Sequence, residues 1–269
     1  MFISVDNLFK DKNPKLHRKI PHFVIRWIER IIHQDEVNEF MEINHNSTGL
    51  EFSNNVIKRL NLTVKVIGEE NIPKAGRCLV ASNHPLGGPD GIALISVIGQ
   101  YRKDIKFPVN DLLMQLYPMQ DIFVPINKFG RHNQNVVKEL NDVFASEDAV
   151  LYFPAGICSR KQKGVIKDLE WKKTIISKAK EYQRDIVPVY FGGQNTNRFY
   201  RIANWRKRLG IKTNIEMFFL PDETFRQYGK EIFIIFGTPI SCSFFDSSKN
   251  EKEWAQWLKE QVYQLKDNI

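Results

Sequence analysis

Residues 82–91 of this chain read SNHPLGGPDG, a turn rich in glycine and proline with a histidine near its start and an aspartate near its end. The apolar run at 78–81 before it predicts a buried strand, and residues 92–101 after it predict a helix. Because α/β proteins expose reactive side chains where a strand passes into a helix, we expect a functional site at this turn.

The two side chains that carry this expectation are His84 and Asp90. A carboxylate that accepts a hydrogen bond from one imidazole nitrogen leaves the other nitrogen able to take a proton, which makes the histidine a general base. The alternative is that His84 is a helix cap or a structural donor. The glycines and prolines around the pair favour the first interpretation, since they let a second molecule approach the backbone closely.

Composition narrows the classes of partner. The chain has 269 residues, 42% of them hydrophobic, and a net charge of +8, which indicates a folded protein with an anionic partner. Nucleic acid and lipid headgroups are the two candidates. Cys78, Cys158 and Cys242 show no CxxC spacing, so neither a disulfide framework nor a metal site is expected. With neither a secretory signal nor an 18-residue apolar stretch, we expect a cytoplasmic protein that lies peripherally on the inner face of the membrane.

Residues 1–60 differ in character from the rest and predict a helical segment that associates with a membrane. Pro21 opens a helix with a one-sided apolar stripe and basic neighbours, which suits a lipid interface. Packing of the stripe on the protein core is the alternative. The stripe comprises Phe23, Val24, Trp27, Ile28, Ile31 and Ile32, and the basic residues are Arg18, Lys19, Arg26 and Arg30. A second helix is expected at 53–60.

Residues 61–269 alternate strand and helix patterns, which predicts an α/β fold with a mixed, largely parallel central sheet flanked by helices. The expected strands are 62–67, 78–81, 105–109, 149–153, 186–191, 215–220 and 232–236. The expected helices are 92–101, 134–145, 171–182, 196–209 and 249–265.

The His84 turn resembles the first signature, His-x4-Asp, of the glycerolipid acyltransferase superfamily, which includes lysophosphatidate acyltransferases. Three more segments resemble that family's later blocks in the same order: 106–113 with 125–128, 153–160 (FPAGICSR) and 186–190 (IVPVY). The resemblance covers about residues 62–240 and makes 61–269 an acyltransferase domain.

This chain departs from the family pattern at two places. Five residues separate His84 from Asp90, with Pro89 where the aspartate is expected. In the third block, Ala155 stands where the family has glutamate and Cys158 where it has arginine. Those two family residues help to hold a phosphorylated glycerol acceptor. The chain is more similar to a hemolysin-like subgroup near enzymes that O-acylate lyso-ornithine or lyso-glycine lipids, whose acceptors carry a carboxylate and no phosphate.

The resemblance implies that a fatty acyl group passes from acyl-carrier protein or coenzyme A to a lyso-lipid hydroxyl, with no other cofactor. His84 is then the base, Asp90 orients it, and backbone N–H groups near Gly156 or in the 86–91 turn stabilise the oxyanion. Asp168 and Glu170 are alternative acidic groups, although solvated carboxylates are the favoured interpretation of both. The implied substrate-binding residues are Asn83, Gly87, Gly88, Asn110, Asp111, Phe153, Pro154, Gly156, Ser159 and Arg160.

Other functions are weaker explanations of the same sequence. The resemblance leaves formation of phosphatidate from a lysophosphatidate acceptor as the alternative reaction. Ser82, Cys158 and Ser159 lie in no Gly-x-Ser-x-Gly elbow, which argues against a hydrolase. A non-enzymatic, membrane-lytic protein would not need His84.

Residues 197–209 interleave aromatic and basic side chains, a pattern that suits either nucleic acid or anionic lipid. With an acyltransferase signature elsewhere, we expect an anionic membrane surface and no nucleic acid.

Overall fold

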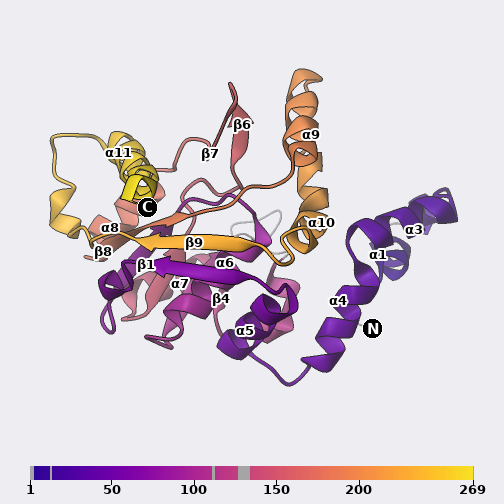
Figure 1. Ribbon diagram of the computed structural model, residues 1–269, viewed down its shortest axis with the longest axis horizontal. Coiled ribbons are helices and arrows are strands. Elements are labelled where there is room, and N and C mark those ends of the chain that lie inside the picture. Colours follow the sequence, from indigo (N-terminus) through magenta and orange to yellow (C-terminus); the bar gives the residue numbers. More distant parts are fainter. Residues whose placement is uncertain (1–2, 13, 111–112, 127–133, 269) are drawn as a thin grey trace. The chain divides into compact units, whose positions relative to one another are not determined.

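The computed structural model describes residues 3–12, 14–110, 113–126 and 134–268. The chain forms two compact units (Figure 1). The smaller comprises Met1–Ser47 with Asn195–Tyr228, and the larger comprises Thr48–Gln194 with Gly229–Ile269. This division differs from the predicted one at residue 60, because the helix at 49–59 belongs to the larger unit and residues 195–228 belong to the smaller.

The larger unit is built on a seven-stranded sheet with the strand order β1-β9-β8-β2-β5-β3-β4. Each neighbouring pair is parallel except β8 and β9, which run antiparallel. The predicted mixed, largely parallel sheet is therefore confirmed. The strands are β1 (Thr63–Ile67), β2 (Cys78–Ser82), β3 (Ile105–Val109), β4 (Phe123–Pro125), β5 (Ala149–Tyr152), β8 (Asp185–Phe191) and β9 (Glu231–Phe236).

Helices accompany this sheet in the α/β order that the sequence predicts. Apolar side chains from β2, β5, α8 and α11 pack into one core, which includes Leu79, Val150, Ile176 and Leu258, all at most 1% exposed. Burial of such side chains is the main force that holds the layers together. The helices are α5 (Gly49–Arg59), α6 (Gly88–Ile98), α7 (Gln134–Ala145), α8 (Thr174–Glu181) and α11 (Glu251–Gln264).

Short elements complete the larger unit. An antiparallel ribbon of β6 (Arg160–Gln162) and β7 (Val165–Lys167) stands apart from the main sheet. Neither these strands nor β4 are predicted from the sequence, because three residues are too few to show a period. Single 3₁₀ turns are η1 (Glu69–Asn71), η2 (Leu113–Gln115), η3 (Tyr117–Met119), η5 (Cys242–Phe244) and η6 (Leu265–Asn268).

The smaller unit is helical, and a hydrogen bond and an aromatic contact join its two chain segments. His33 Nε2 lies 3.2 Å from Asp222 Oδ1, and Trp27 meets Phe219 edge to face at 6.4 Å between ring centroids. Its elements are α1 (Val5–Lys12), α2 (Pro14–His17), α3 (His22–Ile31), α4 (Gln34–Ile43), α9 (Asn197–Arg208), η4 (Ile215–Phe219) and α10 (Leu220–Phe225).

The predicted strand at 215–220 is wrong. These residues form η4 and the start of α10, with Pro221 in the first turn of that helix. A short apolar run has no period that distinguishes a buried strand from a helix. Here the deciding contact is an ion pair between Arg206 of α9 and the fully buried Glu216, 2.8 Å apart, which fixes η4 against α9.

Helix α3 confirms the predicted basic amphipathic helix but splits its apolar stripe. Ile25 is buried, whereas Phe23 and Trp27 are 69% and 53% exposed. These two side chains, with Val24, Arg26 and Arg30, line an apolar hollow of about 580 Å³. In the described part of the chain, no helix has the length and apolarity needed to cross a membrane.

Candidate active site

The predicted His84 turn follows β2, which lies between β5 and β8 in the sheet. Asn83 fixes the start of the turn. Its Nδ2 donates to the Phe191 carbonyl at 2.9 Å, and its Oδ1 accepts from the Phe191 N–H at 2.7 Å. Asn83 is 2% exposed, so the structure uses this side chain to hold the turn on β8 rather than to face a substrate.

His84 and Asp90 meet as the sequence predicts, with Nδ1 of the ring 2.8 Å from Oδ2 of the carboxylate. Asp90 also accepts from the N–H groups of Leu86 and Gly87, at 3.0 and 3.1 Å. It lies in the first turn of α6, where the helix dipole favours a negative charge. Gly87 has a φ of 98° and a ψ of −104°. This conformation, available to glycine, lets the turn absorb the extra residue.

The electrostatics of this pair set the tautomer of the histidine. Asp90 has no exposed surface, and burial raises the pKa of its carboxyl group; the hydrogen bond and charge of His84 and the two backbone donors oppose that rise. An ionised Asp90 requires the proton on Nδ1, which leaves the Nε2 lone pair to accept a proton. No hydrogen-bond partner of Nε2 is found among the described residues.

Two aromatic side chains pack beside the ring of His84 and hold it in place. Phe153 stacks on it with centroids 4.1 Å apart and planes inclined by 17°, and Phe107 meets Phe153 edge to face at 5.4 Å. The His84 side chain keeps 16% of its surface exposed. The site therefore leaves a small part of the imidazole exposed beside two packed aromatic rings.

Asp168 is a buried carboxylate beneath the same turn, so its interpretation as a solvated residue is wrong. Its Oδ1 accepts from the His84 N–H at 3.2 Å and from the Ser159 hydroxyl at 2.6 Å. Its Oδ2 accepts from the Trp171 indole at 2.9 Å. Asp168 is 3% exposed, whereas Glu170 is exposed and pairs with Lys252 at 2.8 Å.

The sequence gives only a partial indication that Asp168 is buried. The carboxylate stands three residues before a tryptophan, soon after the third block, and a tryptophan there predicts burial of its surroundings. The hydroxyl of Tyr263, which accepts from the Asp168 N–H at 2.8 Å, comes from α11, 95 residues further along the chain. No local pattern can indicate such a partner.

The third block wraps around His84 through its backbone. The Ser159 N–H donates to the His84 carbonyl at 2.7 Å, and Pro154 and Gly156 form the turn between, with Gly156 at a φ of 72°. Arg160 is 6% exposed, and its Nη1 donates to the Cys158 carbonyl at 2.5 Å and contacts the Cys158 sulfur at 3.2 Å. Arg160 therefore points into the protein.

Most of the expected backbone donors for an oxyanion are already used. The N–H groups of Leu86 and Gly87 donate to Asp90, and the Gly156 N–H donates to the Phe153 carbonyl at 2.9 Å. These three N–H groups are therefore not open to an oxyanion. Gly88 is the exposed first residue of α6. No hydrogen bond of its N–H group is found in the part of the chain that the structure describes.

Two further residues were predicted to line the site. Asn110 follows β3, and its Oδ1 accepts from the Leu113 N–H at 3.2 Å, which caps the η2 turn. Asp111 lies outside the described residues.

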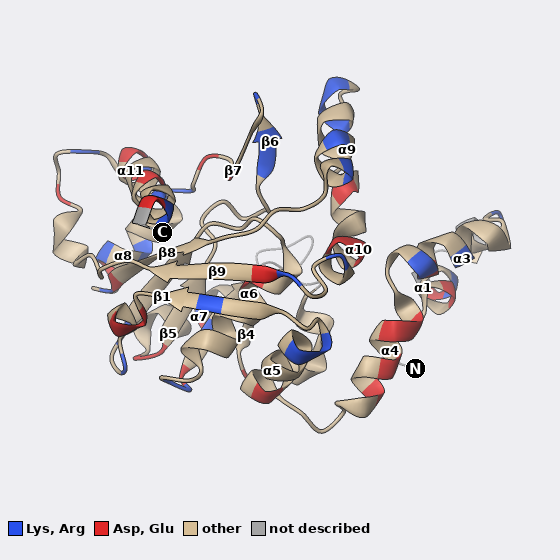
Figure 2. Cartoon of the chain, viewed as in Figure 1, with Lys and Arg blue, Asp and Glu red and all other residues tan. Residues whose placement is uncertain are grey.

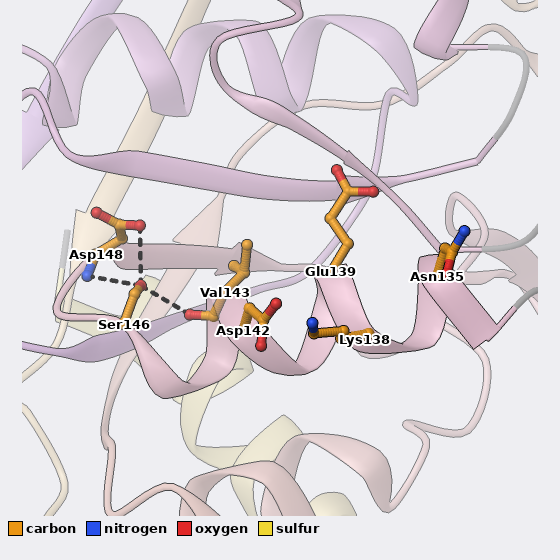
Figure 3. A pocket seen from close by; sticks show the side chains of 7 residues that line it. All are labelled: Asn135, Lys138, Glu139, Asp142, Val143, Ser146 and Asp148. Carbon is orange, nitrogen blue, oxygen red and sulfur yellow. Dashed lines mark hydrogen bonds between the residues drawn. The ribbon is translucent and has the colours of Figure 1, made fainter.

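A surface hollow of about 460 Å³ lies elsewhere, along α7 and the turn that leads to β5 (Figure 3). Ser146 bridges the Val143 carbonyl and Asp148 within it. The other lining residues are Asn135, Lys138, Glu139 and Asp142. None of the predicted site residues lines this hollow.

Basic residues gather along α9 in the smaller unit (Figure 2). The large apolar side chains of this segment face different surroundings, because Phe199 is fully buried while Trp205 and Leu209 are 72% and 68% exposed. Arg198 pairs with Asp222, and Arg206 pairs with Glu216.

Comparison with known proteins gives consistent results. A family model described as "Acyltransferase" matches residues 7–269. The chain is 46% identical over 264 residues to the lyso-glycine lipid O-acyltransferase of Bacteroides thetaiotaomicron, covering 98% of this chain and 97% of that protein. It is 42% identical to the protein of the same name from Phocaeicola vulgatus, with 98% and 95% covered.

A solved structure is also similar. The 1-acyl-sn-glycerophosphate acyltransferase of Thermotoga maritima matches with a TM-score of 0.48 and 18% identity, over 80% of this chain and 81% of that one. The family model spans nearly the whole sequence, and the two curated relatives match it over almost their full length. This chain belongs to the acyltransferase family.

Proposed function

We propose that this acyltransferase moves a fatty acyl group from an acyl thioester, on acyl-carrier protein or coenzyme A, to the hydroxyl of a lyso-glycine lipid. The observation that carries the proposal is the 2.8 Å contact between His84 Nδ1 and the buried Asp90, which prepares Nε2 as a base. The two relatives named for this acceptor support the choice of substrate.

The mechanism follows from the tautomer of His84. Nε2 takes the proton of the acceptor hydroxyl as the oxygen attacks the thioester carbonyl. Asp90 stabilises the imidazolium that forms. The exposed Gly88 N–H at the start of α6 is the backbone donor best suited to the oxyanion. When the tetrahedral intermediate collapses, the C–S bond breaks and the imidazolium returns its proton to the thiolate. The attacking oxygen belongs to the substrate, so no acyl-enzyme forms.

Cys158 has the wrong properties for a nucleophile. The thiol is buried, and burial raises its pKa to about 11. A thiol with this pKa is protonated at neutral pH, and the thiolate is the reactive form. The chemistry therefore belongs to His84.

The third block supports an acceptor without a phosphate. Ala155 cannot hydrogen bond to a glycerol hydroxyl, and Cys158 stands where a phosphate-binding arginine is expected from the resemblance. Arg160, two residues on, is turned inward. A lysophosphatidate acceptor thus lacks the two side chains, a glutamate and an arginine, that the resemblance leads one to expect in the third block, which favours the lyso-glycine lipid.

We also propose that α3 places the enzyme on an anionic membrane, where a lyso-lipid acceptor resides. Phe23 and Trp27 are exposed beside Arg26 and Arg30. Aromatic side chains next to basic ones bind the interface between lipid headgroups and acyl chains. The enzyme is then peripheral, on the cytoplasmic face where acyl thioesters are made.

The experiment that tests this function is lipid mass spectrometry of a strain that lacks the gene. We expect loss of the diacylated glycine lipid with accumulation of its lyso form. Reintroducing the wild-type gene should reverse both changes, and a His84→Ala gene expressed at the same level should not. A change confined to lipids derived from phosphatidate would show that the acceptor is lysophosphatidate instead.

A further inference from the structure

We infer that Lys172 binds the carboxylate of the acceptor headgroup and so determines specificity. This inference rests on the proposed function, because it concerns how the same site holds its lyso-glycine lipid. It adds a binding residue that neither the motifs nor the relatives' names indicate.

The acceptor needs a cation near the third block. A glycine headgroup carries one carboxylate, and a carboxylate that leaves water requires a charged partner or several hydrogen bonds. The side chain expected from the motif is missing at Cys158. Arg160 contacts the Cys158 carbonyl and sulfur, and it is buried, so its guanidinium faces the protein interior. Another residue must supply the charge.

Lys172 lies against the turn of the third block. Its N–H donates to the Pro154 carbonyl at 3.0 Å. A β-carbon placed on Gly156 would lie only 2.8 Å from Lys172 Nζ, so the ammonium group stands directly over this glycine. The same turn leads back to Phe153, whose ring stacks on His84.

The neighbours of Lys172 fix its backbone. Trp171 donates its indole N–H to Asp168 at 2.9 Å, and Asp168 holds His84 and Ser159. The Trp171 carbonyl accepts from Gln256 at 2.8 Å. Asp168 thus ties the segment that carries Lys172 to the segment that carries the base, and this gives the cation a defined place relative to the reaction.

Lys172 differs from the other lysines around it. Lys173 lies 4.0 Å from Glu251, Lys252 pairs with Glu170 at 2.8 Å, and Lys259 donates to the carbonyls of Asp168 and Leu169. The Lys172 ammonium is exposed and has neither a hydrogen bond nor an ion pair among the residues described. A solvated ammonium over a glycine turn can receive a carboxylate without first breaking a contact.

The test compares two acceptors with purified full-length enzyme. One is a lyso-glycine lipid, and the other is the same lipid with its carboxylate converted to a primary amide. KM for each acceptor, KM for the acyl thioester and kcat are measured for wild type, Lys172→Gln and Lys172→Arg. Lys173→Gln is the control that removes a neighbouring charge.

We expect wild type to prefer the carboxylate over the amide by about tenfold in KM, as one charge-assisted contact predicts. Lys172→Gln should abolish that preference by raising KM for the carboxylate alone, with kcat and KM for the thioester unchanged. Lys172→Arg should restore part of it, and Lys173→Gln should match wild type.

Two results would overturn the inference alone: an unchanged preference in Lys172→Gln, or a rise in KM for the thioester in place of the acceptor. If the wild-type enzyme does not acylate the lyso-glycine lipid at all, the proposed function fails, and the inference fails with it.

Discussion

The His84 turn and the exposed face of α3 present their side chains in opposite ways. In and beneath the turn, the polar side chains of Asn83, Asp90 and Asp168 are buried and hydrogen bonded, and the His84 side chain is 16% exposed. On α3, the large side chains of Phe23 and Trp27 are exposed to water.

Under the proposed function, this contrast separates the site of acyl transfer from the surface that binds the membrane. A base must be held in one tautomer and one orientation, which requires a closed network of partners. A lipid-binding face needs exposed apolar area and positive charge, and it tolerates variation in geometry. Changes in the two regions should therefore affect different measurements.

The largest effect is expected from Asp90→Asn. Oδ2 of Asp90 accepts from His84 Nδ1 and from the N–H groups of Leu86 and Gly87, so the amide oxygen of the variant can take the same place and keep the ring proton on Nδ1. The variant lacks the negative charge that stabilises the imidazolium, and we expect kcat to fall about 10²- to 10⁴-fold in a steady-state acyl-transfer assay. Binding to vesicles should be unchanged; wild-type kcat would show that the charge of Asp90 does not support the base.

Removing the buried carboxylate of Asp168 should lower the free energy of unfolding. Asp168→Ala leaves the His84 N–H, the Ser159 hydroxyl and the Trp171 indole without their acceptor. We expect the free energy of unfolding in urea to fall by about 2–4 kcal/mol. Glu170→Ala, at an exposed carboxylate nearby, is the control and should change it by less than about 0.5 kcal/mol. Equal effects of the two variants would refute the role given to Asp168.

A substitution on the exposed face of α3 should change vesicle binding and leave the rate of acyl transfer nearly unchanged. Trp27→Ala is expected to weaken retention on vesicles of anionic phospholipid by about tenfold, since burial of one large side chain is lost. Activity on an acceptor dispersed in detergent should be little affected. Tyr117→Ala removes an aromatic residue of the larger unit that is 67% exposed and serves as the control. Vesicle binding that is the same in both variants would argue against α3 as the contact.

The smallest effect is expected at Cys158. Because burial raises the pKa of its thiol to about 11, this cysteine should react with a thiol reagent at pH 8 only after unfolding, whereas the less buried Cys242 should react in the native protein. Cys158→Ala should keep kcat within about threefold of wild type, measured in the same assay. A loss of kcat comparable to that of Asp90→Asn would point to a covalent acyl-cysteine intermediate.

The sequence predicts the two regions through different signals, and neither signal shows how side chains distant along the chain pack together. The glycine-rich turn and the family blocks bring His84, Asp90 and Phe153 together. His84 and Phe153 follow strands with clear apolar runs, and Asp90 lies in the first turn of the helix after the turn. The helix at 22–31 follows from the 3.6-residue period. Neither signal shows that Arg160 turns inward, since that depends on its contacts with Cys158.

Long-range packing sets what the sequence leaves open. Asp168 is buried because Tyr263 of α11 and Trp171 cover it, and residues so distant along the chain leave no local pattern. The segment at 215–220 is helical because Glu216 pairs with Arg206. In both cases a buried ion or hydrogen bond overrides the local preference.

The most direct test of the central claim is product analysis of purified wild type and His84→Ala with a lyso-glycine lipid and an acyl thioester. Mass spectrometry should show that wild type adds one acyl chain as an ester of the lipid hydroxyl. His84→Ala should form that product at least about 100-fold more slowly, because the base is lost. Equal rates for the two proteins, or no ester product from wild type, would contradict the account.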